Sequence, residues 1–320
     1  MVKKTLPIIT QKDVLILKQL LEDGRKSSAS ISKEIDLGRE IVNYRIKRLI
    51  KENLIVKFIP KINEIAMNYQ EYIILLKLNL DDEVSRDEFI KDHIGNKYII
   101  WIVKSESGWD LIVRLYAQSI DEFKEKLSEI LESFSDVLAN YYTIITSSEI
   151  KECENDIILD KLFKEKPKKD FKEIKTGVLP QLDEKDKEIL GILQEDARIQ
   201  YKEIGVQLDI SSDTVKYRID KMKSQGIIEN IVPIINLTSL GLFQYACVLN
   251  FSYLGKEETA LFNEYLKENS NVIRAIKSLN NDEFFITLAF GKEDEINLFK
   301  EEIKNSFSSK IIDFDVFIIN

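Results

Sequence analysis

Apolar residues recur at helical spacing in a segment that begins near residue 183, and an extended run follows them. Asp183 and Ser211 are residue types that favour helix N-termini, and Gly226 is typical of a helix end. The pattern therefore predicts three short helices and then an extended stretch that reaches Pro233. The apolar positions expected in the core are Ile189, Leu190, Leu193, Ile204, Leu208, Val215, Ile219 and Met222.

The same pattern occurs 173 residues earlier, with no insertion or deletion. Thr10 favours a first helix, Asp23 and Gly24 end it, and Gly38 leads into a third helix. Residues 10–63 and 183–236 share 18 identical pairs in 54 positions, and the offset between them is constant. A period this long indicates a duplicated domain pair.

Three short helices with a tight turn before the third, followed by an extended wing, are typical of a winged helix-turn-helix. The alternative is a small helical bundle that contacts no partner. The third helix of the first copy favours DNA, because residues 39–61 carry seven basic and two acidic side chains, a net charge of +5. The corresponding residues 212–234 sum to +1.

The predicted DNA-binding residues lie on the outward face, the flanks and the beginning of each third helix. Arg45 and Arg218 are predicted to contact phosphates. Positions near the helix start are where base edges are usually reached. The full set is Arg39, Asn43, Tyr44, Arg45, Lys47, Arg48, Ser212, Asp213, Thr214, Lys216, Tyr217, Arg218 and Lys221.

The second half of each copy alternates strand-like and helical runs in the order βαββαβ. The strand-like runs are Tyr72–Leu80, Tyr98–Lys104, Leu111–Tyr116, Asn140–Thr146, Tyr245–Phe251, Val272–Leu279, Phe284–Phe290 and Ile311–Ile319. The helical runs are Glu83–His93, Asp121–Leu138, Thr259–Glu268 and Glu293–Ser306. This order predicts a ferredoxin-like antiparallel sheet with both helices on one face. The fold class is α+β, with two repeats of a winged helix-turn-helix and a ferredoxin-like domain.

Residues 73–76 and 98–103 are apolar without alternation. A sheet with one wet face should alternate, so both faces are predicted to be buried. The helix-free face then needs a partner, either the other copy's sheet or another chain's. We therefore expect a covalent pseudo-dimer, and a homo-oligomer through the ferredoxin-like sheets.

These patterns divide the chain into five segments. They are a winged helix-turn-helix at 8–63, a ferredoxin-like ligand and dimerisation domain at 64–147, a linker at 148–180, a second winged helix-turn-helix at 181–236 and a second ferredoxin-like domain at 237–320. Residues 148–178 carry eight basic and eight acidic side chains, which indicates a solvated tether. A short helix is expected at Ile157–Phe163.

Composition narrows the class of protein. The chain has 320 residues and 44% hydrophobic residues, enough for several cores. Cys153 and Cys247 lie far apart, so they predict neither a metal-ligand pair nor a disulfide framework. No run approaches the roughly 18–20 apolar residues of a membrane span, and we expect a cytoplasmic protein. The net charge of −9 argues against indiscriminate nucleic-acid binding and leaves a local basic patch open.

The second copy also carries a family resemblance. Leu182-Asp-Glu-Lys-Asp186, Leu193-Gln-Glu-Asp196 and Ser211-x-x-Thr214-Val215-x-x-Arg218-Ile219 resemble the Lrp/AsnC (leucine-responsive, feast/famine) transcription regulators. Gly226-Ile227-Ile228 and Leu240-Gly241 fit the same pattern. A winged helix followed by βαββαβ is that family's architecture. Each copy has this order once, so the resemblance covers nearly the whole chain.

The resemblance implies binding to double-stranded DNA and an effector of the amino-acid class near the loop between the second and third strands. In the first copy this loop contains Gly108 and Asp110, the predicted effector-binding residues. A plain hairpin turn is the alternative for these two residues. The second copy has Asn281, Asp282 and Glu283 there, and loss of the glycine argues against an effector site in that copy.

Residues typical of catalysis are few, and neither an enzymatic activity nor a cofactor or metal is predicted. His93 precedes Gly95 at an expected helix end and is interpreted as a cap. Tandem siroheme decarboxylases share the architecture and resemble one another through histidine and arginine on the second and third strands. Here those strands read Trp101-Ile-Val-Lys104 and Leu111-Ile-Val-Arg114. The alternatives kept open are a DNA-free amino-acid sensor and such an enzyme.

Overall fold

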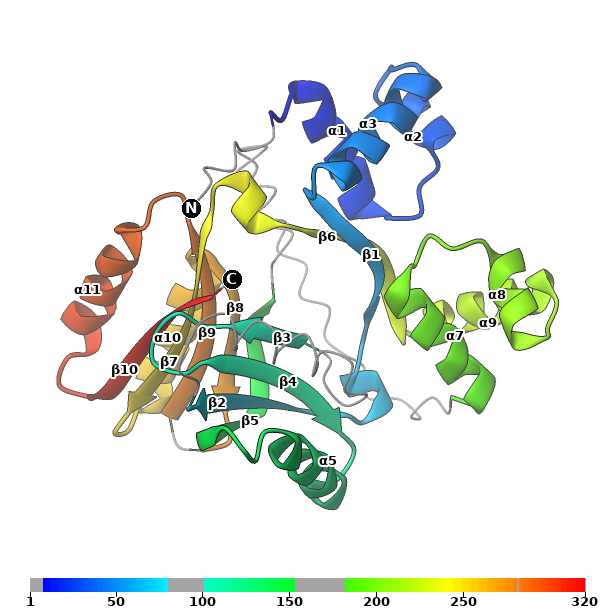
Figure 1. Ribbon diagram of the computed structural model, residues 1–320. Helices are drawn as coiled ribbons and strands as arrows, with labels where there is room; N and C mark the ends of the chain where they lie inside the picture. The colour runs from blue at the N-terminus through cyan, green and yellow to red at the C-terminus, as the bar shows by residue number, and fades with distance from the viewer. Residues whose placement is uncertain (1–7, 80–100, 153–181, 281, 320) are drawn as a thin grey trace. The chain divides into compact units, whose positions relative to one another are not determined.

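The computed structural model describes residues 8–79, 101–152, 182–280 and 282–319. These residues form two compact units, and each unit takes segments from both copies (Figure 1). The first unit contains both helical trios, on segments that end at Asn68 and at Gly241. The second unit contains both βαββαβ halves, on segments that begin at Tyr69 and at Leu242. Like parts of the two copies therefore assemble with each other.

Both predicted helical trios are present in the first unit. Copy one contributes α1 (Gln11–Glu22), α2 (Ser28–Glu34) and α3 (Arg39–Lys51), and copy two contributes α7 (Glu184–Glu195), α8 (Tyr201–Leu208) and α9 (Ser212–Ser224). Thr10, Gly38, Asp183 and Ser211 are the N-caps of α1, α3, α7 and α9, as predicted. Gly226 follows α9 with φ +72°, a backbone conformation that glycine adopts readily.

The extended stretches after the trios pair with each other. β1 (Ile55–Ile62) and β6 (Ile228–Ile235) form an antiparallel two-stranded sheet, with Pro60 opposite Ile231 and Phe58 opposite Pro233. The sequence predicted an extended wing stretch after each trio, and both strands are present. Their pairing with each other was not predicted, because the apolar pattern of one strand does not identify its partner. Short 3-10 helices, η1 (Ile65–Met67) and η2 (Leu237–Leu240), follow the strands.

The second unit holds one eight-stranded sheet. Copy one contributes β2 (Gln70–Leu78), β3 (Trp101–Lys104), β4 (Leu111–Ala117) and β5 (Leu138–Glu152), and copy two contributes β7 (Phe243–Phe251), β8 (Val272–Ser278), β9 (Asp282–Phe290) and β10 (Ile311–Ile319). The order β10-β7-β9-β8-β5-β2-β4-β3 joins two ferredoxin-like sheets at β5 and β8. A bridge between Ser105 and Ile319 brings the other two edges together.

Both faces of β2 are buried, as the lack of alternation in residues 73–76 predicted, whereas Trp101, Ile102 and Val103 of the second apolar run are half-buried. In β2, Ile74 and Leu76 lie in the core that α5 (Ile120–Ser133) covers, whereas Ile73 and Leu75 enter a core shared by the two copies. α10 (Lys256–Glu268) and α11 (Glu295–Phe307) cover the copy-two sheet. The helix-free faces therefore pack on each other within one chain, which supports the expected pseudo-dimer.

Some expected boundaries move, and some lie outside the described residues. β5 continues to Glu152 because its last residues pair with β8, so residues 148–152 belong to a strand and not to the linker. α5 ends at Ser133, five residues before the predicted Leu138. The expected helices at Glu83–His93 and Ile157–Phe163 lie outside the described ranges.

Candidate DNA interface

The third helix of each trio has one buried and one exposed face. In α3, Val42, Ile46 and Leu49 are buried, as their spacing predicted, and Val215, Ile219 and Met222 take the equivalent places in α9. The opposite face exposes equivalent tyrosines, because Tyr44 and Tyr217 are each 68% exposed. Arg39, Lys47, Ser212, Asp213 and Lys216 are also exposed, and Asn43 and Thr214 are half-buried.

Arg45 and Arg48 of α3 converge on one buried carboxylate of α1. Asp13 is 0% exposed, and its oxygens lie 2.9 Å from Arg45 Nη1 and 2.7 Å from Arg48 Nη2. The Thr10 backbone N–H donates to the same carboxylate at 2.8 Å. Burial alone would raise the pKa of Asp13, but the hydrogen bonds from Thr10 and Arg45 and the charge of Arg48 bring this pKa below its ordinary value. The two arginines therefore fix α3 against the beginning of α1.

Arg218 repeats this arrangement in copy two. Its Nη1 lies 2.7 Å from an oxygen of Asp186 and 2.7 Å from one of Asp183, the N-cap of α7. The hydrogen bond from Arg218 is the main reason that the pKa of Asp183 is lowered. The sequence prediction gave Arg45 and Arg218 a phosphate-binding role only and missed this second one. The repeat contained the signal, since Asp13 and Arg45 recur together as Asp186 and Arg218.

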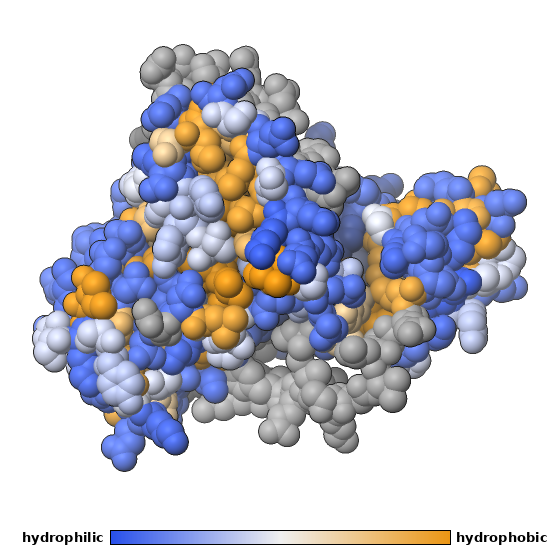
Figure 2. Space-filling model, turned by 90° about the horizontal axis from the view of Figure 1, so that it is seen from below, coloured by the Kyte–Doolittle hydropathy of each residue, from blue (hydrophilic) through white to orange (hydrophobic). Residues whose placement is uncertain are grey.

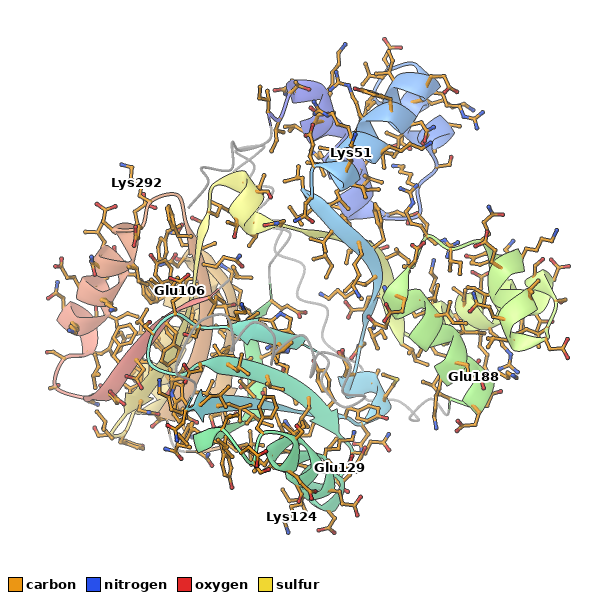
Figure 3. The ribbon with its side chains drawn as sticks, in the orientation of Figure 1. Lys51, Glu106, Lys124, Glu129, Glu188 and Lys292 are labelled. Atoms are coloured by element: carbon orange, nitrogen blue, oxygen red, sulfur yellow. The ribbon has the colours of Figure 1, made fainter. Side chains whose placement is uncertain are left out.

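The two third helices differ in charge on their exposed faces. Copy one exposes Lys47 where copy two exposes Asp220, and it exposes Lys51 where copy two has Ser224. Lys51 lies in the last turn of α3, close to the chain's entry into β1 (Figure 3). Other cations of the basic segment contact copy two, because Lys57 donates to the Gln194 carbonyl and Lys61 pairs with Glu229. The positive face available to a partner is therefore mainly that of α3.

Reciprocal contacts hold the two trios in a pseudo-symmetric pair. Arg25 Nη2 donates to the Ile199 carbonyl at 2.7 Å, and Arg198 Nη2 donates to the Lys26 carbonyl at 3.2 Å. Arg25 also lies over the Tyr201 ring. Backbone hydrogen bonds are reciprocal in the same way: the N–H of Gly24 donates to the Ile231 carbonyl, and the N–H of Ala197 donates to the Phe58 carbonyl. The arginine and backbone hydrogen bonds recur at the 173-residue offset, as in a two-fold interface.

The predicted effector residues, Gly108 and Asp110, form a tight turn in the second unit. Gly108 has φ +72°, and a Cβ there would lie 2.8 Å from the Phe317 ring of copy two. Asp110 is buried, accepts a hydrogen bond from the Leu78 N–H at 2.9 Å and pairs with Lys77 at 3.1 Å. Both residues therefore shape the turn, and a direct contact with an effector stays a prediction.

A surface cavity of about 480 Å³ lies beside this turn. Ser107 of copy one lines it together with copy-two residues, including Tyr245, Glu293, Asn297 and Lys300. The cavity thus combines a hydroxyl, a carboxylate and an ammonium group from two copies. The sequence predicted Gly108 and Asp110 in this turn as site residues, and none of the copy-two residues that line the cavity.

Within the described ranges, no helix is long and apolar enough to cross a membrane, and no three His, Cys, Asp or Glu side chains are grouped to hold a metal ion. The surface in Figure 2 carries hydrophobic residues in small groups between hydrophilic ones. Isolated exposed apolar side chains are ordinary for a protein surface and identify no interface by themselves.

Comparison with known proteins identifies the class of the helical trios. The family model for winged helix-turn-helix DNA-binding matches residues 9–56 and 182–229. The HTH-type transcriptional regulator PF1231 of Pyrococcus furiosus is 47% identical over 141 residues, which cover 44% of this chain and 93% of that protein. PF0250 of the same organism is 30% identical over 130 residues, 38% of this chain and 85% of the relative.

Solved structures of one enzyme match almost the whole chain. The siroheme decarboxylase NirDL covers 96% of this chain and 90% of its own, with a TM-score of 0.62 and 13% identity. This similarity shows a shared tandem fold. The chain belongs to the family of HTH-type transcriptional regulators and carries two winged helix-turn-helix matches in tandem.

Proposed function

We propose that one chain binds double-stranded DNA as a pseudo-dimer, with α3 and α9 in successive major grooves. The observation that carries this proposal is the reciprocal set of contacts between the two trios, above all Arg25 with Ile199 and Arg198 with Lys26. A helix-turn-helix dimer reads two half-sites one helical turn, or a multiple of it, apart. Here, the covalent repeat takes the place of the second subunit.

The copies make unequal contributions in this proposal. Arg39, Lys47 and Lys51 give α3 positive charge where phosphates would lie, whereas Asp213 and Asp220 oppose them on α9. Tyr44 and Tyr217 would make equivalent contacts in both half-sites. Arg45, Arg48 and Arg218 act mainly by holding the helix, and their remaining donors would reach phosphates. Copy one therefore supplies most of the electrostatic affinity.

A salt titration of DNA binding tests this proposal. We would compare the full chain with a Lys47→Glu/Lys51→Glu variant on DNA from the gene's own upstream region. Both lysines are exposed, so the variant leaves the contacts of Asp13 intact. The wild type should bind with a slope of about −0.9 per neutralised phosphate, and the variant should lose most of its affinity. No salt-sensitive binding by the wild type would favour the DNA-free sensor instead.

The effector is proposed to bind in the cavity beside Ser107. An amino acid carries one carboxylate and one ammonium group, which Lys300 and Glu293 would complement. Calorimetric titration with the twenty amino acids should find one that binds wild type and not Lys300→Ala. Failure of all of them with wild type would remove this part of the proposal and leave DNA binding untouched.

A single observation, the whole-chain similarity to NirDL, favours the decarboxylase alternative. Arg114 and Arg274 lie on β4 and β8, but both pair with Glu71 and would have to leave it to bind a substrate carboxylate. A shift of the Soret band of iron-uroporphyrin when the protein is added would support this alternative. A non-enzymatic role, a cytoplasmic location and a homo-oligomer stay predictions. Further chains would associate through surfaces other than the helix-free sheet faces, which pack on each other.

A further inference from the structure

A buried group of charged residues lies where the two ferredoxin-like halves meet. The Glu71 cluster consists of Glu71, Arg114, Thr146 and Glu149 from copy one and Arg274 from copy two. Glu71 is 5% exposed, and its carboxylate lies 2.7 Å from Arg114 Nε and 2.7 Å from Arg274 Nη2. Thr146 Oγ1 donates to Glu71 at 3.0 Å, and Arg274 also pairs with Glu149 at 3.1 Å. Arg274 is thus the one member that copy two contributes.

The pseudo-two-fold interface has a second, equivalent end without this cluster. The bridge between Ser105 and Ile319 corresponds at the 173-residue offset to the pair Ser278 and Thr146. The equivalents of the cluster are Gln244 for Glu71, Thr287 for Arg114, Ile319 for Thr146 and Trp101 for Arg274. One end of the interface therefore holds a buried acid with two arginines, and the other holds uncharged side chains.

We propose that the Glu71 cluster is a recognition element that makes copy one pair with copy two in preference to a like copy from another chain. If two copy-one halves paired, each Glu71 would face Trp101 and keep only Arg114. If two copy-two halves paired, Arg274 would be buried against Gln244 and Thr287, with no carboxylate from the cluster. Glu71 would lose one of its two arginines in the first case, and Arg274 would lose its carboxylates in the second. Loss of a partner from a buried ion pair is strongly destabilising, so both like pairings are penalised. The preferred partner of each half is thus the unlike half, which the same chain supplies.

The cluster makes one chain a complete pairing unit. Burial alone would raise the pKa of Glu71, but Arg274 and Arg114 bring it below the ordinary value, so the acid is charged at neutral pH. Its carboxylate lies against both arginines, and Glu149 and Glu152 lie 3.1 Å and 4.0 Å from Arg274. Arg274 meets these carboxylates only when both copies contribute, which is the property expected of a specificity device.

Charge reversal with complementation tests the proposal on full-length chains. Arg274→Glu places a carboxylate opposite Glu71 and Glu149, and Glu71→Arg places three arginines together. The tether gives pairing within one chain an effective concentration of about millimolar. At micromolar protein, a substitution must therefore weaken pairing within the chain by about a thousandfold before pairing between chains competes with it. Such an effect calls for a side chain of opposite charge and not merely a neutral one. When both variants are mixed, copy one of the first and copy two of the second regenerate the wild-type cluster between chains.

The readout is a disulfide that reports this exchange and no other association. Ser148 and Lys277 are direct partners on β5 and β8, so Ser148→Cys is added to the Arg274→Glu chain and Lys277→Cys to the Glu71→Arg chain. Both chains also carry Cys153→Ser. The control pair has the same cysteine changes and a wild-type cluster. We expect at least tenfold more inter-chain disulfide from the reversed pair after co-expression and oxidation.

An inter-chain yield no higher than that of the control would overturn the proposal. This holds whether the reversed chains are folded separately or fail to fold, because failure to rescue one another shows that the cluster does not direct pairing. A further comparison replaces Glu71→Arg by Gln244→Arg at the equivalent, uncharged end. That pair should match the control, and an equal rise there would show that charge at either end merely loosens the interface.

Discussion

The Asp13 side chain has two structural roles. It accepts a hydrogen bond from the Thr10 N–H at the beginning of α1, and it forms ion pairs with Arg45 and Arg48 of α3. Asp186 holds only one arginine, Arg218, which Asp183 also binds. We therefore expect Asp13→Asn to lower the free energy of unfolding by about 3 kcal/mol, as for a buried pair that loses one partner. Asp186→Asn should cost clearly less. Urea unfolding followed by circular dichroism measures both, and equal costs would contradict this account.

The effect of Asp13 should depend on pH. Its pKa in the folded chain is below the ordinary value, so its contribution to stability is present at neutral pH and lost as pH falls through the folded pKa. The difference in unfolding free energy between wild type and Asp13→Asn should be constant from pH 7 to about 5 and shrink below about pH 4. A difference that stays the same down to pH 3 would show that the charge of Asp13 is not what stabilises the helix pair.

A substitution at Gly108 tests the close contact between the turn at Gly108 and Asp110 and Phe317 of copy two. Gly108→Ala would force a Cβ to 2.8 Å from Phe317 at φ +72°, and we expect a loss of about 2 to 3 kcal/mol. Gly191 is the matched control, because it lies inside α7 with no atom within 4 Å of an added Cβ. Gly191→Ala should stabilise by up to about 1 kcal/mol. Thermal unfolding of both variants measures these changes in stability.

At the residue scale, the sequence pattern did not predict the contacts that the candidate site residues make in the structure. Arg45 and Arg218 stood out because they recur in a helix expected to meet DNA. Their ion pairs with Asp13 and Asp186 join residues 32 positions apart, a separation that helical periodicity does not address. Gly108 and Asp110 were recognised as turn residues, and the contact with Phe317 required the structure.

The third helices of the two copies differ in the charge of their exposed faces. Lys47 and Asp220 occupy equivalent exposed positions of α3 and α9. Lys47→Ala should reduce the salt slope of DNA binding by about 1, the value for one phosphate contact, whereas Asp220→Lys should increase it by about as much and raise affinity. Fluorescence anisotropy at several salt concentrations measures both. No change in slope for either variant would place the DNA on another face.

Helices and strands could be predicted from the pattern, but the partners of the strands could not. Periodicity located α1, α3, α7 and α9 almost to the residue, because capping residues bound each apolar stripe. The pairing of β1 with β6 and of β5 with β8 depends on residues more than a hundred positions away. Burial of both faces of β2 was predictable, since an unalternating apolar run excludes a wet face.

At the scale of the whole molecule, reciprocal contacts in the first unit should set the spacing of the two half-sites. Arg25→Ala and Arg198→Ala together remove both arginine links and leave α3 and α9 unchanged. We expect wild type to lose affinity when one to three base pairs are inserted between half-sites, and the double variant to tolerate them. Gel-shift titration on such a series is the measurement. An identical spacing preference would show that the β1–β6 sheet alone sets the distance.

A hydroxyl-radical footprint of one chain on its selected DNA site tests whether the chain binds DNA as a pseudo-dimer. We expect two protected regions about ten base pairs apart, centre to centre, on one face of the helix, with the stronger protection next to copy one. Lys47→Glu/Lys51→Glu should weaken that region first. A single protected region, or two equal regions that respond equally to these changes, would contradict a chain that reads DNA as an asymmetric pseudo-dimer.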